Sequence, residues 1–261
     1  MQKSLTFAIL LSTLMASTPL AAQINVPERF VQIRTLDFEN GTLELHNFGS
    51  ATEFLNGWRF CSHDENQDRQ YSATAGLNGR MLGPGESLFV HYNNDASAGN
   101  EIDISTIGGN FALPFDTNGA YAIQIFFQTP FSNGNNIADH VQVSRFGADD
   151  TRADERSDEA ENGGVWADQS EWVPVVDSTL RVVLKDASSN NELHSASDYE
   201  NEFSFLLGDV NCDDVVNLLD VVPFIDALGG GGAFSQKADV NLDGAINLLD
   251  VSRFIEIVAG N

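Results

Sequence analysis

Apolar and polar residues alternate along much of the chain between residues 24 and 186. Val31 and Ile33 form the first such pair, and similar runs follow at Leu43, Leu45, Tyr121, Ile123, Ile125, Val141, Val143, Leu180, Val182 and Leu184. Successive residues of a strand point to opposite faces of a sheet, so this period of two predicts strands with one face in a core.

Turn signals rich in Gly and Asn separate the alternating runs. They are Asn40-Gly41, Asn56-Gly57, Asn78-Gly79, Gly83-Pro84-Gly85, Asn118-Gly119 and Asn133-Gly134. Asn-Gly pairs favour tight turns between antiparallel strands, because both residues tolerate positive φ. The sequence therefore predicts a mainly β, antiparallel sandwich over residues 23–186.

The pattern changes after residue 206, where apolar residues recur at helical spacing. The two sets are Val221, Phe224, Ile225, Leu228 and Val251, Phe254, Ile255, Val258. We expect two short helices with these residues in a core. Pro223 lacks an N–H, so the first helix should start late or bend there. Residues 187–205 are polar and rich in Ser and Asn, which predicts a linker.

Residues 209–221 and 239–251 are two copies of one sequence unit, offset by 30 residues. Both copies begin with Asp-Val-Asn and end with Asn-Leu-Leu-Asp-Val. A repeat at fixed period indicates a structural unit that is used twice.

Each copy carries oxygen-bearing side chains at positions 1, 3, 5 and 12 of a twelve-residue loop. They are Asp209, Asn211, Asp213 and Asp220 in the first loop, and Asp239, Asn241, Asp243 and Asp250 in the second. Calcium takes six to eight oxygen ligands, and a loop with this spacing can supply them, with a carbonyl at position 7 (Val215, Ala245). Such a run can also be a solvated cluster of Asx-turns. Two copies in register favour two Ca²⁺ sites.

Residues 206–261 resemble a type I dockerin, a duplicated loop-helix calcium module. Asp at position 12 fits this resemblance, because the EF-hand loop has a bidentate Glu there. The resemblance implies a small α-helical module with two EF-hand-like calcium loops, and a cohesin-like or cell-surface protein as partner. Position 6, which usually needs positive φ, is Gly244 in the second loop but Asp214 in the first. Gly adopts positive φ more freely than Asp, so we expect the first site to be weaker.

Two Leu pairs occupy positions 10 and 11 of the loops, Leu218-Leu219 and Leu248-Leu249. In dockerins these positions help to bind cohesin, so the resemblance implies a duplicated apolar docking surface that could bind in two orientations. The alternative is that one Leu of each pair packs between the helices.

The earlier part of the chain resembles a lamin-tail domain. The residues that carry this resemblance are the strand and turn at 43–50, the Leu-Asn-Gly-Trp run ending at Trp58, the hairpin at 82–90 and the late strand at 139–143. The resemblance implies an immunoglobulin-like β-sandwich with binding or scaffold roles and no shared catalytic residues. Trp58 is expected in its core.

The first 22 residues have the pattern of a secretory signal peptide. Lys3 precedes an apolar run at residues 5–15, and a segment ending in Ala21-Ala22 follows. We expect cleavage after Ala22 and an extracellular or cell-surface protein. No later stretch is long and apolar enough to predict a membrane span.

The chain is strongly acidic, with a formal net charge of -25 at pH 7. This charge argues against nucleic acid and anionic membranes as partners, and it suits calcium. Cys61 and Cys212 lie in different predicted domains, so we expect two independent thiols, although export permits a disulfide.

The sequence shows no recognisable catalytic motif. The histidines are scattered, and no metal-binding His/Cys spacing, nucleophile elbow or phosphate loop occurs. We therefore favour a non-catalytic protein. The alternative is a carbohydrate-active component of a polysaccharide-degrading assembly, either a sugar-binding module or, by association with dockerins, a glycoside hydrolase. In that alternative, Trp166 and Trp172 beside the acidic stretch 148–162 would stack on sugar rings; otherwise they close the sandwich edge.

Overall fold

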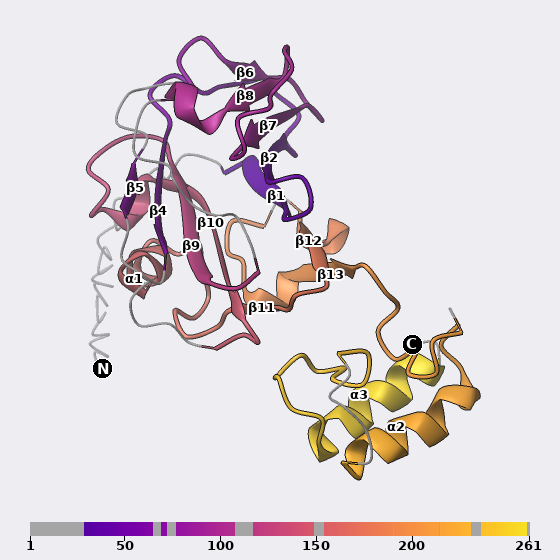
Figure 1. Cartoon of the computed structure of the whole chain (residues 1–261). Helices are drawn as coiled ribbons and strands as arrows, with labels where there is room; N and C mark the ends of the chain where they lie inside the picture. Colours follow the sequence, from indigo (N-terminus) through magenta and orange to yellow (C-terminus); the bar gives the residue numbers. More distant parts are fainter. Residues whose placement is uncertain are drawn as a thin grey trace, which may run out of the picture.

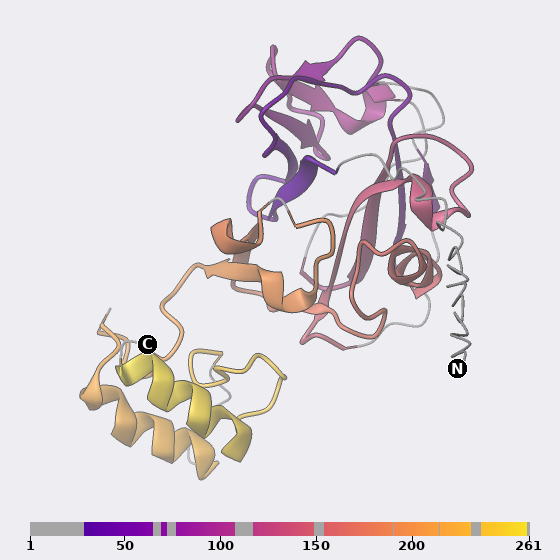
Figure 2. The same ribbon diagram turned by 180° about the vertical axis from the view of Figure 1, so that it is seen from behind.

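The structure is a computed structural model of the 261-residue chain. It describes residues 29–64, 69–71, 77–107, 117–148, 154–189, 191–213, 215–230 and 236–259. The expected signal peptide with its cleavage site after Ala22 lies outside these residues, and so does Asp214. Figure 1 shows a β-rich region followed by helices that lie together near the C-terminus, and Figure 2 shows the same arrangement from behind.

The larger sheet has six strands in the order β13-β12-β1-β2-β7-β8. All neighbouring strands in it are antiparallel except β7 and β8, which are parallel. The strands are β1 (Val31–Asp37), β2 (Thr42–Asn47), β7 (Ser87–His91), β8 (Glu101–Asp103), β12 (Thr179–Leu184) and β13 (Tyr199–Phe203).

The second sheet has five strands in the order β11-β10-β9-β4-β5, and β10 and β11 form its one parallel pair. The strands are β4 (Arg59–Asp64), β5 (Arg69–Tyr71), β9 (Ala120–Phe126), β10 (Ile137–Arg145) and β11 (Val173–Val175). A short pair, β3 (Glu53–Phe54) and β6 (Met81–Leu82), and the 3-10 helices η1 (Ile104–Ile107) and η2 (Gly134–Asn136) complete this part. The predicted antiparallel sheets are therefore confirmed, with parallel pairs at two edges.

One hydrophobic core is shared by the two large sheets. It takes apolar residues from both, including Ile33, Leu45, Ile123 and Val141, all fully buried. Trp58 also lies in this core, where its ring meets that of Phe127 edge to face at 5.0 Å. The core position predicted for Trp58 is confirmed.

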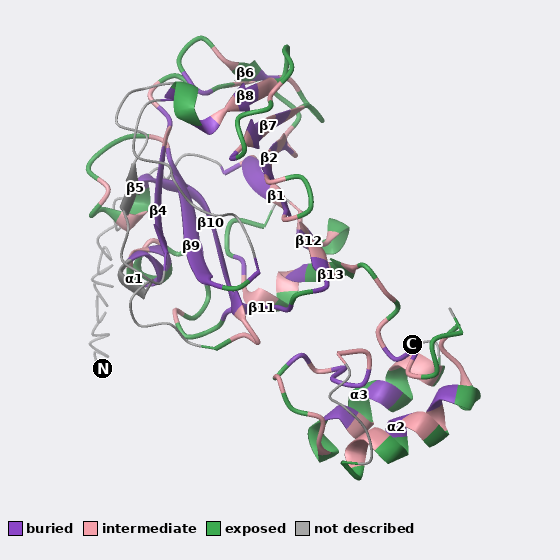
Figure 3. Ribbon diagram, in the orientation of Figure 1, coloured by how far each residue is buried: buried purple, intermediate pink, exposed green. Residues whose placement is uncertain are grey.

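Strands β9 and β10 are buried on both faces, which the alternating pattern did not predict. Helix α1 (Asp154–Asn162) and the chain after it cover their second face (Figure 3). Two glutamines on that face donate to backbone carbonyls, and the first of them, Gln124, donates to the carbonyl of Arg156 at 2.5 Å. Gln142 donates to two carbonyls of the covering segment at 2.8 and 2.7 Å. Buried polar groups are tolerated there because they are hydrogen-bonded.

Trp166 and Trp172 belong to this covering segment and are buried, with 0% and 4% of their surface exposed. The indole N–H of Trp166 donates to the carbonyl of Glu171 at 3.0 Å. A sugar ring cannot reach the face of a buried indole. The hypothesis that these two residues stack on sugar is therefore wrong, and they close the edge of the domain instead.

Residues 187–205 contain more regular structure than the expected linker. The 3-10 helices η3 (Asp186–Ser188) and η4 (Ala196–Asp198) lead into β13, which pairs with β12 along its length. Ser195 and Asp198 form a reciprocal capping box at η4. The segment is polar because it contains a capping box and an edge strand. Both of these features use or expose polar groups, as a linker does.

The C-terminal region contains η5 (Leu218–Asp220), α2 (Val221–Leu228) and α3 (Leu248–Ala259). In the first repeat the α-helix begins three residues later than in the second, with η5 in between. This confirms the late start expected from Pro223, which lies in the first turn of α2, where its missing N–H leaves no helical bond unmade.

The rings of Phe224 and Phe254 stack at 3.8 Å in the centre of this region. Together with Ala238 and Val240 they form a small separate core. Ile225 and Ile255, which were expected in the core, are 58% and 60% exposed. That expectation is wrong, because the small region offers each helix one buried stripe only.

Cys61 is buried and Cys212 is exposed, and the two do not form a disulfide with each other, as expected. Among the described residues, no helix is both long and apolar enough to cross a membrane.

Candidate metal-binding loops

The first repeated loop is held by hydrogen bonds between its own carboxylates and backbone. Asp209 Oδ1 and Asn211 Oδ1 both accept from the N–H of Asp213, at 3.0 and 2.9 Å. The carboxylate of Asp220 accepts from the N–H groups of Asn211 and Asn217 at 3.0 and 2.9 Å. These hydrogen bonds connect positions 1, 3, 5 and 12 of the loop to one another.

The second loop repeats this pattern almost bond for bond. Asp239 Oδ1 and Asn241 Oδ1 accept from the N–H of Asp243 at 3.1 and 3.0 Å. The carboxylate of Asp250 accepts from the N–H groups of Asn241 and Asn247 at 3.2 and 2.8 Å. The sequence repeat is therefore also a repeat of backbone conformation and hydrogen bonding.

Asn217 and Asn247 stabilise the ends of the two loops, which the sequence analysis missed. The side-chain oxygen of each Asn accepts a hydrogen bond from the backbone N–H two residues later in the chain. Asn217 accepts from Leu219 at 2.7 Å, and Asn247 accepts from Leu249 at 2.8 Å. Asn217 and Asp220 form a capping box at the start of η5. The signal was present in the sequence, since Asn is a preferred helix N-cap and occupies the same position of both copies.

Position 4 of each loop has a left-handed backbone, with φ of 62° at Cys212 and 61° at Leu242. Position 6 of the second loop, Gly244, has φ of 84°, as the sequence analysis expected. Non-Gly residues at positive φ are uncommon, so the loop imposes this conformation on position 4. The residue types Cys and Leu do not predict a positive φ at this position.

The carboxylates at positions 1 and 12 are almost completely buried in both loops. Asp209 and Asp239 are 1% exposed, and Asp220 and Asp250 are 0% exposed. Burial raises the pKa of Asp239 to about 6, with further increases from the negative charges of Asp250 and Asp243, although the N–H of Gly244 acts against them. Buried carboxylates of like charge are costly unless a cation compensates them.

The chemistry of these residues fits a hard cation. Within the described part of the chain, no three Asp, Glu, His or Cys side chains are grouped so that they alone could hold a metal ion. The loops also carry Asn amide oxygens and backbone carbonyls, and carboxylate, amide and carbonyl oxygens are the kinds of ligand that Ca²⁺ takes. The position 7 carbonyls of Val215 and Ala245 accept from the side-chain amides of Asn217 and Asn247, at 3.4 and 3.2 Å.

The two loops differ at the second oxygen of position 1. Asp239 Oδ2 accepts from the N–H of Gly244 at 2.9 Å. Asp209 Oδ2 forms an ion pair with Lys237 Nζ at 2.8 Å. The second loop also touches the β-rich domain, since a Cβ added to Gly244 would lie 3.0 Å from ring atoms of Phe146.

The two Leu pairs lie on the surface beside the loops. Leu218 and Leu219 are 76% and 68% exposed, and Leu248 and Leu249 are 81% and 69% exposed. The alternative that one Leu of each pair packs between the helices is therefore wrong. An apolar groove continues this surface between α2 and α3, lined by Leu218, Val221, Phe224, Ile225, Leu228, Val251, Phe254, Ile255, Val258 and Ala259. Exposed apolar patches of this kind mark interaction sites.

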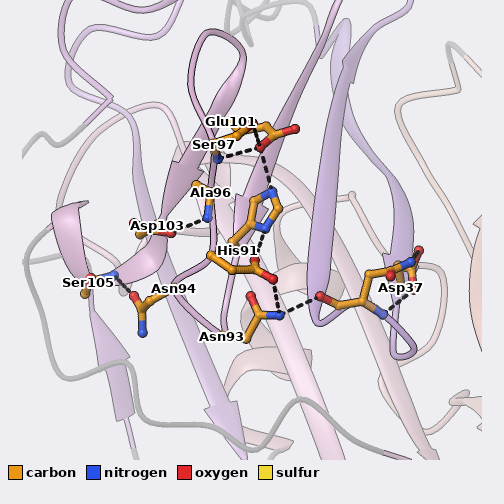
Figure 4. A network of polar contacts seen from close by, with 11 residues as sticks. Asp37, His91, Asn93, Asn94, Ala96, Ser97, Glu101, Asp103 and Ser105 are labelled. Atoms are coloured by element: carbon orange, nitrogen blue, oxygen red, sulfur yellow. Dashed lines mark hydrogen bonds and ion pairs between the residues drawn. The ribbon is translucent and has the colours of Figure 1, made fainter.

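A polar cluster around His91 in the β-rich domain joins neighbouring turns, unlike the acidic loops. His91 lies at the end of β7, with Nδ1 2.5 Å from Asp95 and Nε2 3.6 Å from Glu101, while Glu101 also accepts from Ser97 (Figure 4). Asn93 ties this network to the turn after β1 by donating to the carbonyl of Asn40. These contacts join neighbouring turns, and Figure 4 shows the side chains bonded to one another at the surface.

His46, Ser87 and Glu44 come closest to a catalytic arrangement, but the order is unsuitable. The hydroxyl of Ser87 contacts His46 Nδ1 at 2.8 Å and donates to Glu44 Oε1 at 2.6 Å. In a nucleophilic triad the imidazole stands between hydroxyl and carboxylate, so that it can accept the proton. Here the hydroxyl stands between the other two, and its proton is held by the carboxylate.

Comparison with known families identifies the C-terminal region. A family model described as "Dockerin type I domain" matches residues 207–258. Dockerin type I domains are generally calcium-binding and attach proteins to cohesin partners, so the match supports a dockerin at the C-terminal end of this chain and, through it, protein-protein attachment. The match covers the two loops and α2 and α3, and it does not extend over the β-rich domain. No curated protein matches the chain.

Proposed function

We propose that this chain is an exported attachment protein, in which the dockerin fixes the β-rich domain to a cohesin-like or other cell-surface protein. The observation that carries the proposal is the twofold arrangement of exposed Leu pairs, each beside an acidic loop whose first and last carboxylates are buried. The β-rich domain is the displayed part, a lamin-tail-like immunoglobulin fold with a binding or scaffold role and no catalytic site.

Each loop would hold one Ca²⁺ ion. The proposed ligands are Asp209, Asn211, Asp213, Asp220 and the Val215 carbonyl in the first loop, and Asp239, Asn241, Asp243, Asp250 and the Ala245 carbonyl in the second. Calcium supplies the positive charge that offsets these carboxylates, and its binding is therefore coupled to folding of the region. The chain's own contribution is to hold the carboxylates at positions 1 and 12 by backbone N–H groups.

Folding of the loops presents the docking surface. Asp220 and Asp250 are the last loop ligands and also belong to η5 and to the first turn of α3. The Leu pairs directly precede these two residues. Ordering each loop therefore orients its Leu pair, and the near-identity of the two units lets a partner bind in either of two orientations.

Calorimetric titration of calcium into residues 23–261 tests the proposal. We expect two binding events in the parent protein and one in each of Asp209→Ala and Asp239→Ala. Asp226→Asn is the matched control, because it removes an exposed carboxylate from α2 and should leave both events unchanged. Absence of calcium binding up to ~1 mM, the range of weak extracellular sites, would refute the proposal.

Attachment is tested by pull-down with a panel of cohesins and with cell-wall fractions. Changing one Leu pair to Ser should weaken binding only slightly, since the second unit remains, whereas changing both pairs should abolish it. Abolition by a single pair would show that one orientation alone is used.

A further inference from the structure

Lys237 reaches from the start of the second repeat into the first loop. It lies two residues before Asp239, yet its ammonium is 2.8 Å from Asp209 Oδ2. Its carbonyl accepts the N–H of Gly208 at 2.8 Å, which fixes its backbone beside the first loop. Its Nζ also lies 5.8 Å from the centre of the Phe205 ring. The Lys237 side chain is 18% exposed, whereas the Asp209 side chain that it meets is 1% exposed.

The corresponding oxygen of the second loop has a neutral partner. Asp239 Oδ2 accepts from the backbone of Gly244, and the charges that act on Asp239, those of Asp250 and Asp243, are negative. The residue equivalent to Lys237 in the first repeat is Leu207, which has no charge. Among the residues that the structure describes, a cation thus pairs with the position 1 carboxylate of the first loop and not with that of the second.

We propose that Lys237 is a built-in counter-ion that sets the calcium affinity of the first loop. The inference rests on the proposed function of the loops as calcium sites. A calcium ion and an ammonium group on one carboxylate repel each other, so calcium must displace Lys237 to bind. This competition lowers the affinity of the first loop and makes the second loop fill first.

The same contact stabilises the first loop when calcium is scarce. Asp209 is buried, and Lys237 compensates its charge in place of the metal. The second loop lacks such a substitute, so its order depends more strongly on calcium. Lys237 therefore lowers the calcium affinity of the first loop and stabilises that loop in the absence of calcium. Both effects are separate from the effect of the residue at position 6.

Calcium titration of Lys237→Met in residues 23–261 tests this inference, because Met keeps the length of the side chain and removes the charge. An Asp239→Ala background isolates the first loop. We expect Lys237→Met to tighten calcium binding at the first loop by about tenfold. This is the effect of removing one charge-assisted hydrogen bond that competes with the metal for Asp209. Thermal unfolding in chelator should shift to lower temperature.

Lys237→Arg keeps the charge and should retain the weak binding, and Lys185→Met controls for the loss of one positive charge elsewhere. Circular dichroism in saturating calcium checks folding, and Lys237→Gln replaces the Met variant if that one fails to fold. Unchanged or weaker binding in the charge-removing variants overturns the inference, because Lys237 would then be neutral or would orient Asp209 for calcium. Loss of calcium binding in the parent protein overturns the proposed function itself, and the inference with it.

Discussion

The β-rich domain and the dockerin bury charged groups in different ways. In the β-rich domain, Asp139 accepts from the N–H of Ile33 at 2.6 Å and from His194 Nδ1 at 3.3 Å, so residues far apart in sequence compensate one another. In the dockerin, the carboxylates of Asp220 and Asp250 are held by N–H groups of their own loops. Asp139 is thus compensated by distant parts of its own domain, whereas the two dockerin carboxylates have backbone partners from their own loops.

The difference explains how a region with a very small core can still be ordered. Below about 70 residues a single core supplies little stability, and small domains commonly use a bound metal to add to it. The dockerin has a core centred on Phe224 and Phe254, while the β-rich domain has a core shared by two sheets. We therefore expect the two regions to respond separately to calcium, mutation and pH.

Removal of calcium should give the largest difference between the regions. A ligand present at 100 times its dissociation constant stabilises a folded domain by about 2.7 kcal/mol, so two sites contribute about 5 kcal/mol. Differential scanning calorimetry of residues 23–261 should show the dockerin transition falling strongly in chelator, while the β-rich transition stays in place. Equal shifts of both transitions would contradict the separation.

Phe224→Ala should follow in size. It removes half of the stacked pair at 3.8 Å, and truncation of a buried Phe costs about 3–5 kcal/mol. Urea unfolding in saturating calcium measures the change. Ile225→Ala is the matched control on the same helix, because Ile225 is 58% exposed, and such surface changes stay within about 0.5 kcal/mol.

Gly244→Ala should have a smaller effect, confined to the second loop. Its φ of 84° costs an L-residue about 1–2 kcal/mol, and the added Cβ would lie 3.0 Å from the Phe146 ring. We expect weaker calcium binding at the second loop only, measured by calorimetry. Combining it with Phe146→Ala separates the two causes: recovery of binding would assign the loss to the ring, and no recovery would assign it to backbone strain.

The pH dependence of the β-rich domain should be the smallest effect and involves two histidines. Burial lowers the pKa of His140 to about 4. Burial also acts to lower the pKa of His194, but the hydrogen bond and charge of Asp139 outweigh it and raise that pKa above 6.5. Between pH 4 and 6.5 the unfolded chain binds more protons at His140, so stability rises with pH. Above 6.5 the folded domain binds more protons at His194, so stability falls as pH rises through its folded pKa.

Urea unfolding from pH 4 to 9 in constant calcium measures both arms of this profile. His140→Gln should flatten the acid arm, and His194→Gln should flatten the alkaline arm. Each variant is the control for the other. A profile that neither substitution changes would show that other groups set the pH dependence.

Local patterns predicted the parts of the structure that depend on neighbouring residues. The Asn-Gly turns and the alternation at Leu43 and Leu45 gave antiparallel strands, and Pro223 gave the late start of α2. The twelve-residue spacing also located the two acidic loops. This was possible because hydrogen bonds between residues close together in the chain hold the conformation of each loop. Asn217 and Asn247 could have been found by the same reasoning.

Other features depend on contacts between distant segments and were not predictable in this way. The polar segment that was expected to be a linker contributes β13, because β12 offers it an edge. Trp166 and Trp172 are buried because the chain after α1 folds over β9 and β10. Ile225 and Ile255 are exposed because the stacked phenylalanines already fill the space between the helices.

The sequence by itself determined that the chain has alternating strands, two acidic loops with calcium spacing and a duplicated Leu pair, since each depends on residues close together in the chain. Tertiary structure alone decided which residues these elements cover and which charges meet. The ion pair between Lys237 and Asp209 joins residues of different repeats. Its existence depends on how the repeats pack, because an ion pair requires proximity in space, which periodicity in sequence does not specify.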